Sequence, residues 1–162
     1  MKFGKGRVSC CGEARLAGGR YPADAGHVGR FARRKGLTMS KARILIVEDE
    51  ADLAWVEQFN LESEGYEVQV APEGLTALQA LDSFVPDVLV LDVMLPHVDG
   101  WAVLSKAQDI PEERRPKVIV VSAVAGVGDE AKARSLGVGS FLAKPFEMDE
   151  LLRLVERALE AA

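Results

Sequence analysis

Short apolar runs and longer amphipathic segments alternate along most of the chain. Three of the runs, 43–47 (RILIV), 88–91 (VLVL) and 118–121 (VIVV), are continuous and rich in β-branched residues. Such runs are typical of strands that are buried on both faces. The segment 66–71 (YEVQVA) alternates between apolar and polar residues, which predicts an edge strand, and 139–143 (GSFLA) predicts a weaker fifth strand.

Each interval between these runs has apolar residues at helical spacing. In the last interval, Leu151, Leu154 and Val155 fall on one face. Gly65 follows the first helical segment and predicts its C-cap. Helices are predicted over 51–64, 73–82, 100–108, 128–136 and 147–161.

Strands that alternate with single helices through short connections predict an α/β fold. The expected architecture is a doubly wound, five-stranded parallel sheet with helices on both faces. We adopt the flavodoxin-like strand order 2-1-3-4-5, which is a common order for such sheets, as an expectation. A chain of 162 residues has room for one such domain.

Charge divides the chain into two parts. Residues 1–38 hold nine Lys/Arg and two Asp/Glu (net +7), whereas residues 39–162 hold eleven and twenty-three (net −12). Eight of the fifteen glycines also lie in the first part. The sequence therefore predicts a basic, Gly/Arg-rich leader over 1–38 and one folded domain over 39–162.

Three interpretations of the leader stay open. Its few apolar residues and many charges favour disorder, or an upstream start codon with the usual start at Met39. The second interpretation is a basic arm that contacts nucleic acid or an acidic partner. The third is a targeting peptide.

Cysteine usage and hydropathy narrow the class of protein. Cys10 and Cys11 are adjacent and lack zinc-ligand spacing, and the segment 39–162 has no cysteine. No apolar run approaches the roughly 18–20 residues of a membrane helix. These features fit a cytoplasmic protein.

Polar side chains follow four of the five predicted strands. Glu48 and Asp49 follow the first strand, Asp92 the third, Ser122 the fourth and Lys144 the fifth. In open parallel sheets, ligands bind beyond the carboxyl ends of the strands, at the point where strand order reverses. With the expected order, the first and third strands are neighbours about 4.8 Å apart. Their carboxylates could share a hard cation such as Mg²⁺.

Two or three acids, a cation, a hydroxyl and a lysine together form a receptacle for a phosphoryl group, with one carboxylate as the nucleophile. Each residue also has a simpler interpretation. Asp92 could cap a turn, one of residues 48–50 could cap the following helix, and Lys144 could be a solvated surface lysine. The coincidence of four such signals at one sheet edge favours a site.

Four ordered motifs, ILIVEDE, LVLDVMLPHVDG, VIVVSA and FLAKPF, resemble the receiver domain of two-component response regulators over residues 42–159. The resemblance implies that Asp92 is the phosphoacceptor. The donor would be the phosphohistidine of a sensor histidine kinase or a histidine phosphotransferase. The resemblance also implies Mg²⁺, bound by Asp49, Asp92 and the backbone carbonyl of Met94, with Glu48 assisting through water.

The resemblance implies a switch as well. Ser122 would hold a phosphoryl oxygen, Lys144 would pair with the phosphoryl group, and Phe141 would take the place of the aromatic switch residue. The Lys144–Pro145 peptide bond would be cis. Phosphorylation would then remodel the face of the fourth helix, fifth strand and fifth helix for a downstream effector protein, and it is compatible with homodimer formation.

On this interpretation the protein is a stand-alone receiver, because no output domain is expected after residue 162. It is not an enzyme, since it catalyses only its own phosphorylation and dephosphorylation, and neither a membrane nor nucleic acid is an expected partner. Met94 and Val124 are apolar neighbours of the phosphoryl group, and we hypothesise that they slow its hydrolysis by restricting an aligned water.

Three other classes of protein fit the sequence less well. A phosphohydrolase that forms an aspartyl-phosphate requires an acid two residues after the nucleophile, where this chain has Met94. A dinucleotide-binding module requires a third glycine that GVG at 126–128 and 137–139 lacks. An inactive receiver-like module is disfavoured because every acceptor-site residue is present.

Overall fold

A computed structural model describes residues 41–95, 99–123 and 127–160, without the side chains of 127–130. The leader, the predicted boundary between residues 38 and 39, and Val124 lie outside the described residues. The five strands of the described part form one parallel sheet in the order β2-β1-β3-β4-β5, which confirms the expected topology. They are β1 (Arg43–Val47), β2 (Glu67–Ala71), β3 (Val88–Asp92), β4 (Lys117–Ser122) and β5 (Ser140–Ala143).

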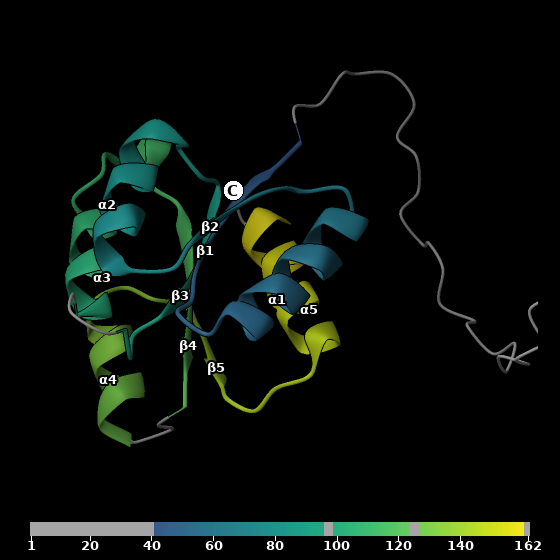
Figure 1. Ribbon diagram of the computed structural model, residues 1–162. Coiled ribbons are helices and arrows are strands. Elements are labelled where there is room, and N and C mark those ends of the chain that lie inside the picture. Colours follow the sequence, from purple (N-terminus) through teal and green to yellow (C-terminus); the bar gives the residue numbers. More distant parts are fainter. Residues whose placement is uncertain (1–40, 96–98, 124–126, 161–162) are drawn as a thin grey trace, which may run out of the picture. The chain divides into compact units, whose positions relative to one another are not determined.

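Five α-helices cover the two faces of this sheet. Figure 1 shows α1 and α5 on one face and α2, α3 and α4 on the other. The helices are α1 (Ala51–Ser63), α2 (Gly74–Ser83), α3 (Gly100–Gln108), α4 (Val127–Ser135) and α5 (Met148–Glu160). A short 3₁₀ turn, η1 (Glu112–Arg114), interrupts the loop before β4 and has no counterpart in the sequence prediction. The predicted helix bounds agree with the structure to within one residue.

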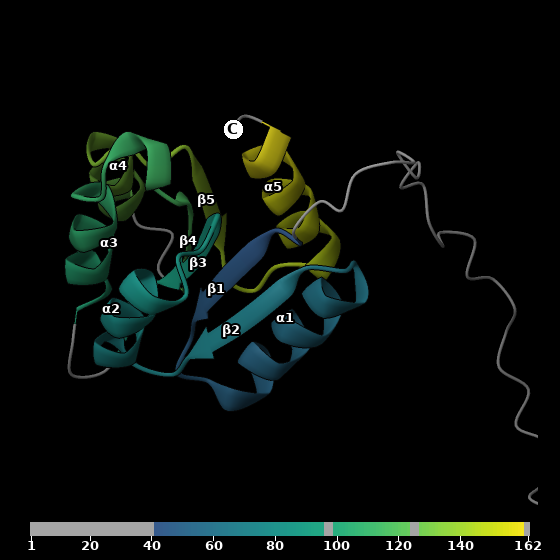
Figure 2. The ribbon, with the colours of Figure 1, turned by 90° about the horizontal axis from the view of Figure 1, so that it is seen from above.

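Alternation along the buried strands decides which face each side chain enters. In β1, Ile44 and Ile46 join the apolar cluster under α1 and α5, whereas Leu45 and Val47 join the cluster under α2, α3 and α4. The sheet is therefore buried on both faces, as the continuous apolar runs predict. Figure 2 shows the sheet between its two helix layers, with β2 and β5 at the edges.

Two predictions about single positions are also confirmed. Strand β2 lies at an edge, and its side chains alternate between exposed and partly buried along most of its length. Gly65 has φ +94°, a left-handed conformation that favours glycine, and its N–H donates to the Glu62 carbonyl at 2.9 Å. It ends α1 as expected. Among the helices that the structure describes, none is both long and apolar enough to cross a bilayer.

Candidate functional site

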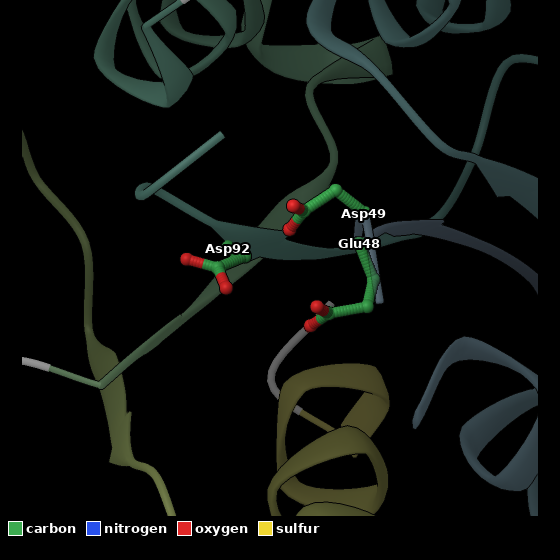
Figure 3. A group of neighbouring side chains, drawn as sticks. All are labelled: Glu48, Asp49 and Asp92. Atoms are coloured by element: carbon green, nitrogen blue, oxygen red, sulfur yellow. The ribbon is translucent and has the colours of Figure 1, made fainter. Parts of the chain in front are cut away.

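Three carboxylates meet at the C-terminal edge of the sheet. Glu48 and Asp49 directly follow β1 and Asp92 ends β3, and these two strands are hydrogen-bonded neighbours. One oxygen from each of the three residues lies within 4.8 Å of the others. Figure 3 shows the side chains of Glu48 and Asp49 reaching Asp92 from the neighbouring chain segment. We call Glu48, Asp49 and Asp92 the acid cluster; the sequence predicted this gathering.

Burial differs sharply within the acid cluster. Glu48 is only 2% exposed and Asp92 only 4%, whereas Asp49 is exposed. Alternation places Glu48 and Asp92 on the face of α1 and α5, because each lies two residues after a residue of that cluster, Ile46 and Val90. Two nearly buried carboxylates side by side repel each other strongly unless a cation compensates them.

Lys144 supplies that cation. Its Nζ donates to Glu48 Oε2 and to Asp92 Oδ2, both at 2.6 Å. The residue follows β5, and its backbone N–H donates to the Ser122 carbonyl at 2.9 Å, which fixes it beside the end of β4. The Lys144–Pro145 peptide bond is cis. Lys144 is thus ion-paired with two members of the acid cluster and is not a solvated surface lysine.

The pKa directions fit this arrangement. Burial raises the pKa of the Glu48 carboxyl, and the hydrogen bond from Lys144 offsets only part of that effect. Burial alone would lower the pKa of the Lys144 ammonium, but its hydrogen bonds to Asp92 and Glu48 outweigh burial and raise it. Lys144 therefore stays charged and remains the fixed positive group of the site.

The donor set fits a hard divalent cation. All three side chains offer carboxylate oxygen, and their spacing would let one ion contact them directly or through water. The exposure of Asp49 leaves the cluster open to solvent on that side. Magnesium, which binds few carboxylates and keeps several waters, matches such a half-open site.

Two side-chain hydrogen bonds hold the segment that follows Asp92. Asp92 Oδ1 accepts from the Met94 N–H at 2.7 Å, so the turn-capping role considered for Asp92 also holds. Further on, Asp99 Oδ1 accepts from the Trp101 N–H at 3.0 Å and caps α3. The Met94 side chain is exposed.

Gly100 is a feature that sequence reasoning missed. A Cβ at this position would lie 2.5 Å from the Val93 Cα and 2.6 Å from the Asp92 carbonyl oxygen. Because only glycine allows so close an approach, the start of α3 can rest directly on the backbone that carries Asp92. The Asp-Gly pair at 99–100 is the signal that could have revealed this contact.

Ser122 and Phe141 lie on the face of the sheet that α2, α3 and α4 cover. Ser122 ends β4 and is fully buried, and Phe141 is partly buried against the cluster under α2, α3 and α4. Phe141 pairs with Val120 in the β4–β5 ladder, two residues before Ser122. Alternation directs Ser122 and Val120 to the same face, so Ser122 and Phe141 share one side of the sheet.

Comparison with known proteins identifies the family. The family model for the response regulator receiver domain matches residues 44–156. The chain belongs to this family. It is a receiver domain and not a conventional enzyme.

Relatives of this receiver domain have diverse lengths. Response regulator PleD from Caulobacter vibrioides is 40% identical over 107 residues, which cover 65% of this chain and 23% of that protein. An uncharacterized 14.6 kDa protein from Leptolyngbya boryana is 34% identical over 120 residues, which cover 74% of this chain and 92% of that protein. The chain thus spans under a quarter of one relative and most of the other.

A solved structure bears on the metal. It is the receiver domain of sensor histidine kinase PA1611 from Pseudomonas aeruginosa PAO1, with magnesium coordinated in its active site cleft. Its identity to this chain is 30% and its TM-score is 0.67, over 75% of this chain and 99% of that one. A receiver domain similar to this one thus binds magnesium in its active site cleft.

The simpler interpretation of residues 48–50, that one of them caps the following helix, holds for the position of Glu50 but not for its side chain. Glu50 occupies the N-cap position of α1, but its side chain makes no capping hydrogen bond. Its N–H instead donates to Glu48 Oε1 at 3.2 Å. The first turn of α1 is held by backbone bonds, such as that from the Ala54 N–H to the Glu50 carbonyl at 2.9 Å.

The receiver domain also buries an acid that sequence reasoning missed. Glu57 of α1 is 1% exposed, and neither of its carboxylate oxygens has a hydrogen-bond partner among the residues that the structure describes. Burial raises its pKa to about 8, and the charge of Glu48 adds to this effect. Glu57 stands between Ala54 and Leu61 at helical spacing, both of them buried, so an acid within an apolar stripe was the available signal.

Proposed function

We propose that this receiver domain takes a phosphoryl group from the phosphohistidine of a histidine kinase or histidine phosphotransferase onto Asp92. The observation that carries the proposal is the setting of the Asp92 carboxylate. It ends a central strand, lies in the acid cluster and is held between the Lys144 ammonium and the Met94 N–H. A nucleophile held this firmly needs little reorganisation before it reacts.

In the reaction, a carboxylate oxygen of Asp92 attacks the phosphorus. The bond from phosphorus to the donor imidazole nitrogen breaks, and its electron pair returns to the imidazole. Lys144 is 2.6 Å from Asp92 and would follow the negative charge as it moves onto the phosphoryl oxygens. The chain's part is to position and neutralise the reacting groups.

Mg²⁺ would be held by Asp49, Asp92 and the Met94 carbonyl, with Glu48 acting through water. When bound, it lowers the repulsion among the carboxylates and the phosphoryl oxygens. The three-carboxylate geometry and the magnesium-bound related structure support this assignment.

Ser122 and Phe141 would form the switch. Their position on one side of the sheet supports a coupled movement, in which Ser122 turns toward a phosphoryl oxygen and Phe141 fills the space behind it. Such a step biases a two-state element and would remodel the α4–β5–α5 face for a downstream effector. Because residue 141 is Phe, the partner would receive no hydroxyl from this side chain.

Met94 and Val124 would make the phosphorylated form long-lived, because apolar neighbours hinder an aligned attacking water. The exposed Met94 side chain beside Asp92 supports this idea. We further propose that the receiver works in the cytoplasm by binding other proteins.

The test is phosphorylation by acetyl phosphate or phosphoramidate with Mg²⁺, followed by intact mass. Wild type and Asp109→Asn, a control at an exposed aspartate outside the acid cluster, should gain one phosphoryl group. Asp92→Asn should gain none, and chelation of Mg²⁺ should abolish the reaction in wild type. Equal phosphorylation of Asp92→Asn would overturn the assignment.

A further inference from the structure

A cavity lies at the end of the sheet away from the acid cluster. A pocket of about 370 Å³ is formed where β4 and β5 begin, beside the C-terminal part of α5 and η1. Figure 1 shows α5 running back from the C-terminal end of β5 toward this end of the sheet. Because β4 has six residues, its length separates the two places by roughly 15–20 Å.

Three cationic side chains line this pocket: Arg115, Lys117 and Arg157. We call it the basic pocket. It holds only one acid, Glu112. The concentration of positive charge is notable because residues 39–162 carry a net charge of −12. Acidic residues outnumber basic ones by about two to one in this segment, whereas the basic pocket has three basic residues and one acid.

None of the three cations is neutralised within the described part of the chain. No described carboxylate lies within 4.0 Å of Arg115, Lys117 or Arg157, whereas Arg43, Lys106 and Lys144 each have an acidic partner. The Arg115 Nε donates to the Ile110 carbonyl at 3.0 Å, which anchors its guanidinium and leaves its other nitrogens available. An anchored guanidinium is well suited to bind a phosphate or carboxylate with two parallel bonds.

The remaining wall of the basic pocket is mixed: Gln108 and Ser140 are polar, and the other lining residues offer apolar side chains or backbone. Pro116, Val118 and Ala158 contribute apolar surface, and Gly137 and Gly139 leave backbone uncovered. A bare inorganic ion would use only the cations, whereas a ligand with an organic part would also cover the apolar wall. The volume falls within the range of about 300–1,000 Å³ that is usual for small-molecule sites.

We propose that the basic pocket binds a phosphorylated organic anion of mononucleotide size. Its phosphate contacts the Arg115 and Arg157 guanidiniums and the Lys117 ammonium, and its organic part lies against Pro116, Val118 and Ala158. This site is independent of the proposed phosphorylation of Asp92, because the two lie at opposite ends of the strands.

Calorimetric titration of the full chain with AMP tests the proposal. AMP should bind saturably, more weakly as salt rises. The double variant Arg115→Ala/Arg157→Ala should weaken binding at least roughly tenfold, because each position removes a charge-assisted hydrogen bond. Arg153→Ala, at an exposed arginine one turn earlier on α5 and outside the pocket, should bind like wild type.

Inorganic pyrophosphate, which lacks an organic part, should bind several-fold more weakly than AMP. Wild-type levels of Asp92 phosphorylation by acetyl phosphate in every variant would show that the fold is intact. The proposal is overturned by an absence of saturable AMP binding, by undiminished AMP binding in the double variant, or by pyrophosphate binding as tight as that of AMP.

Discussion

Replacing Glu57 by leucine should stabilise this receiver domain, and the gain should grow as pH rises. Glu57 is 1% exposed, and within the described part of the chain neither carboxylate oxygen has a hydrogen-bond partner, so its environment favours the neutral acid. The residues beside it at helical spacing on the buried stripe of α1 are Ala54 and Leu61. A leucine would fill a similar volume without a polar group.

The magnitude follows from proton linkage. Burial raises the pKa of Glu57 from 4.5 to about 8. Between these values the folded protein binds more protons than the unfolded chain, so the free energy of unfolding falls as pH rises and the loss is complete above the folded pKa. The full difference between the two pKa values corresponds to roughly 5 kcal/mol in the free energy of unfolding. Roughly 2–3 kcal/mol of this stability should be lost between about pH 6 and pH 9.

Urea unfolding of metal-free protein at several pH values measures this effect. Other titrating groups contribute almost equally to wild type and variant, so the difference between them isolates Glu57. Glu57→Leu should unfold at higher urea than wild type, and the gap should widen by roughly 2–3 kcal/mol between about pH 6 and pH 9.

Two further variants sharpen the experiment. Glu57→Gln keeps a buried polar group but cannot ionise, so it should lose the pH-dependent part of the penalty and keep the rest. Glu62→Gln changes an exposed acid of the same helix and should follow wild type at every pH. Parallel pH curves for wild type and Glu57→Leu would refute the reasoning, because they would mean that Glu57 ionises equally easily in both states.

Three other substitutions test the acid cluster and its supports. Gly100→Ala should lower the free energy of unfolding by about 1–3 kcal/mol and slow phosphorylation, because the new Cβ would meet the backbone of Asp92 and Val93. The control is Gly139→Ala, whose Cβ meets nothing within 4 Å. Equal urea unfolding curves for the two variants would contradict the prediction. Lys144→Met should lower the free energy of unfolding by about 3 kcal/mol or more, because it leaves Glu48 and Asp92 without their cation. Adding Asp92→Asn should recover part of this loss. If it recovers none, the ion pair is not the cause. Met94→Asn should shorten the lifetime of the phosphorylated form in a phosphate-release assay, and an unchanged half-life of seconds in wild type and variant would count against the apolar shield.

The sequence predicted the fold best at the strands that are buried on both faces of the sheet. Apolar runs such as 43–47 and 118–121 are typical of strands buried on both faces, and with single helices between them they predict the α/β class. Asp92 and Lys144 could be placed at one edge because the carboxyl ends of parallel strands coincide. The order of the strands was only an expectation borrowed from a common fold, since alternation alone does not say which strands are neighbours.

Contacts that depend on the exact approach of two segments were not predictable. The steric demand at Gly100 arises where α3 meets the end of β3, and the burial of Glu57 depends on how α1 lies on the sheet. The direct bond from Lys144 to Glu48 also escaped prediction, because the resemblance assigned Lys144 to the phosphoryl group and Glu48 to a water. The sequence also could not show that Glu50, at the N-cap of α1, makes no side-chain capping bond.

The alternation of side chains at the sheet edge has a consequence for evolution. Asp92 and Glu48 continue the register that faces α1 and α5, whereas Ser122 and Phe141 belong to the layer of α2, α3 and α4. On the proposed function, the acceptor Asp92 and the switch pair Ser122 and Phe141 therefore belong to opposite layers of the domain. Substitutions that change only the packing around Phe141 could then alter partner binding while Asp92 and its ion pair with Lys144 stay as they are.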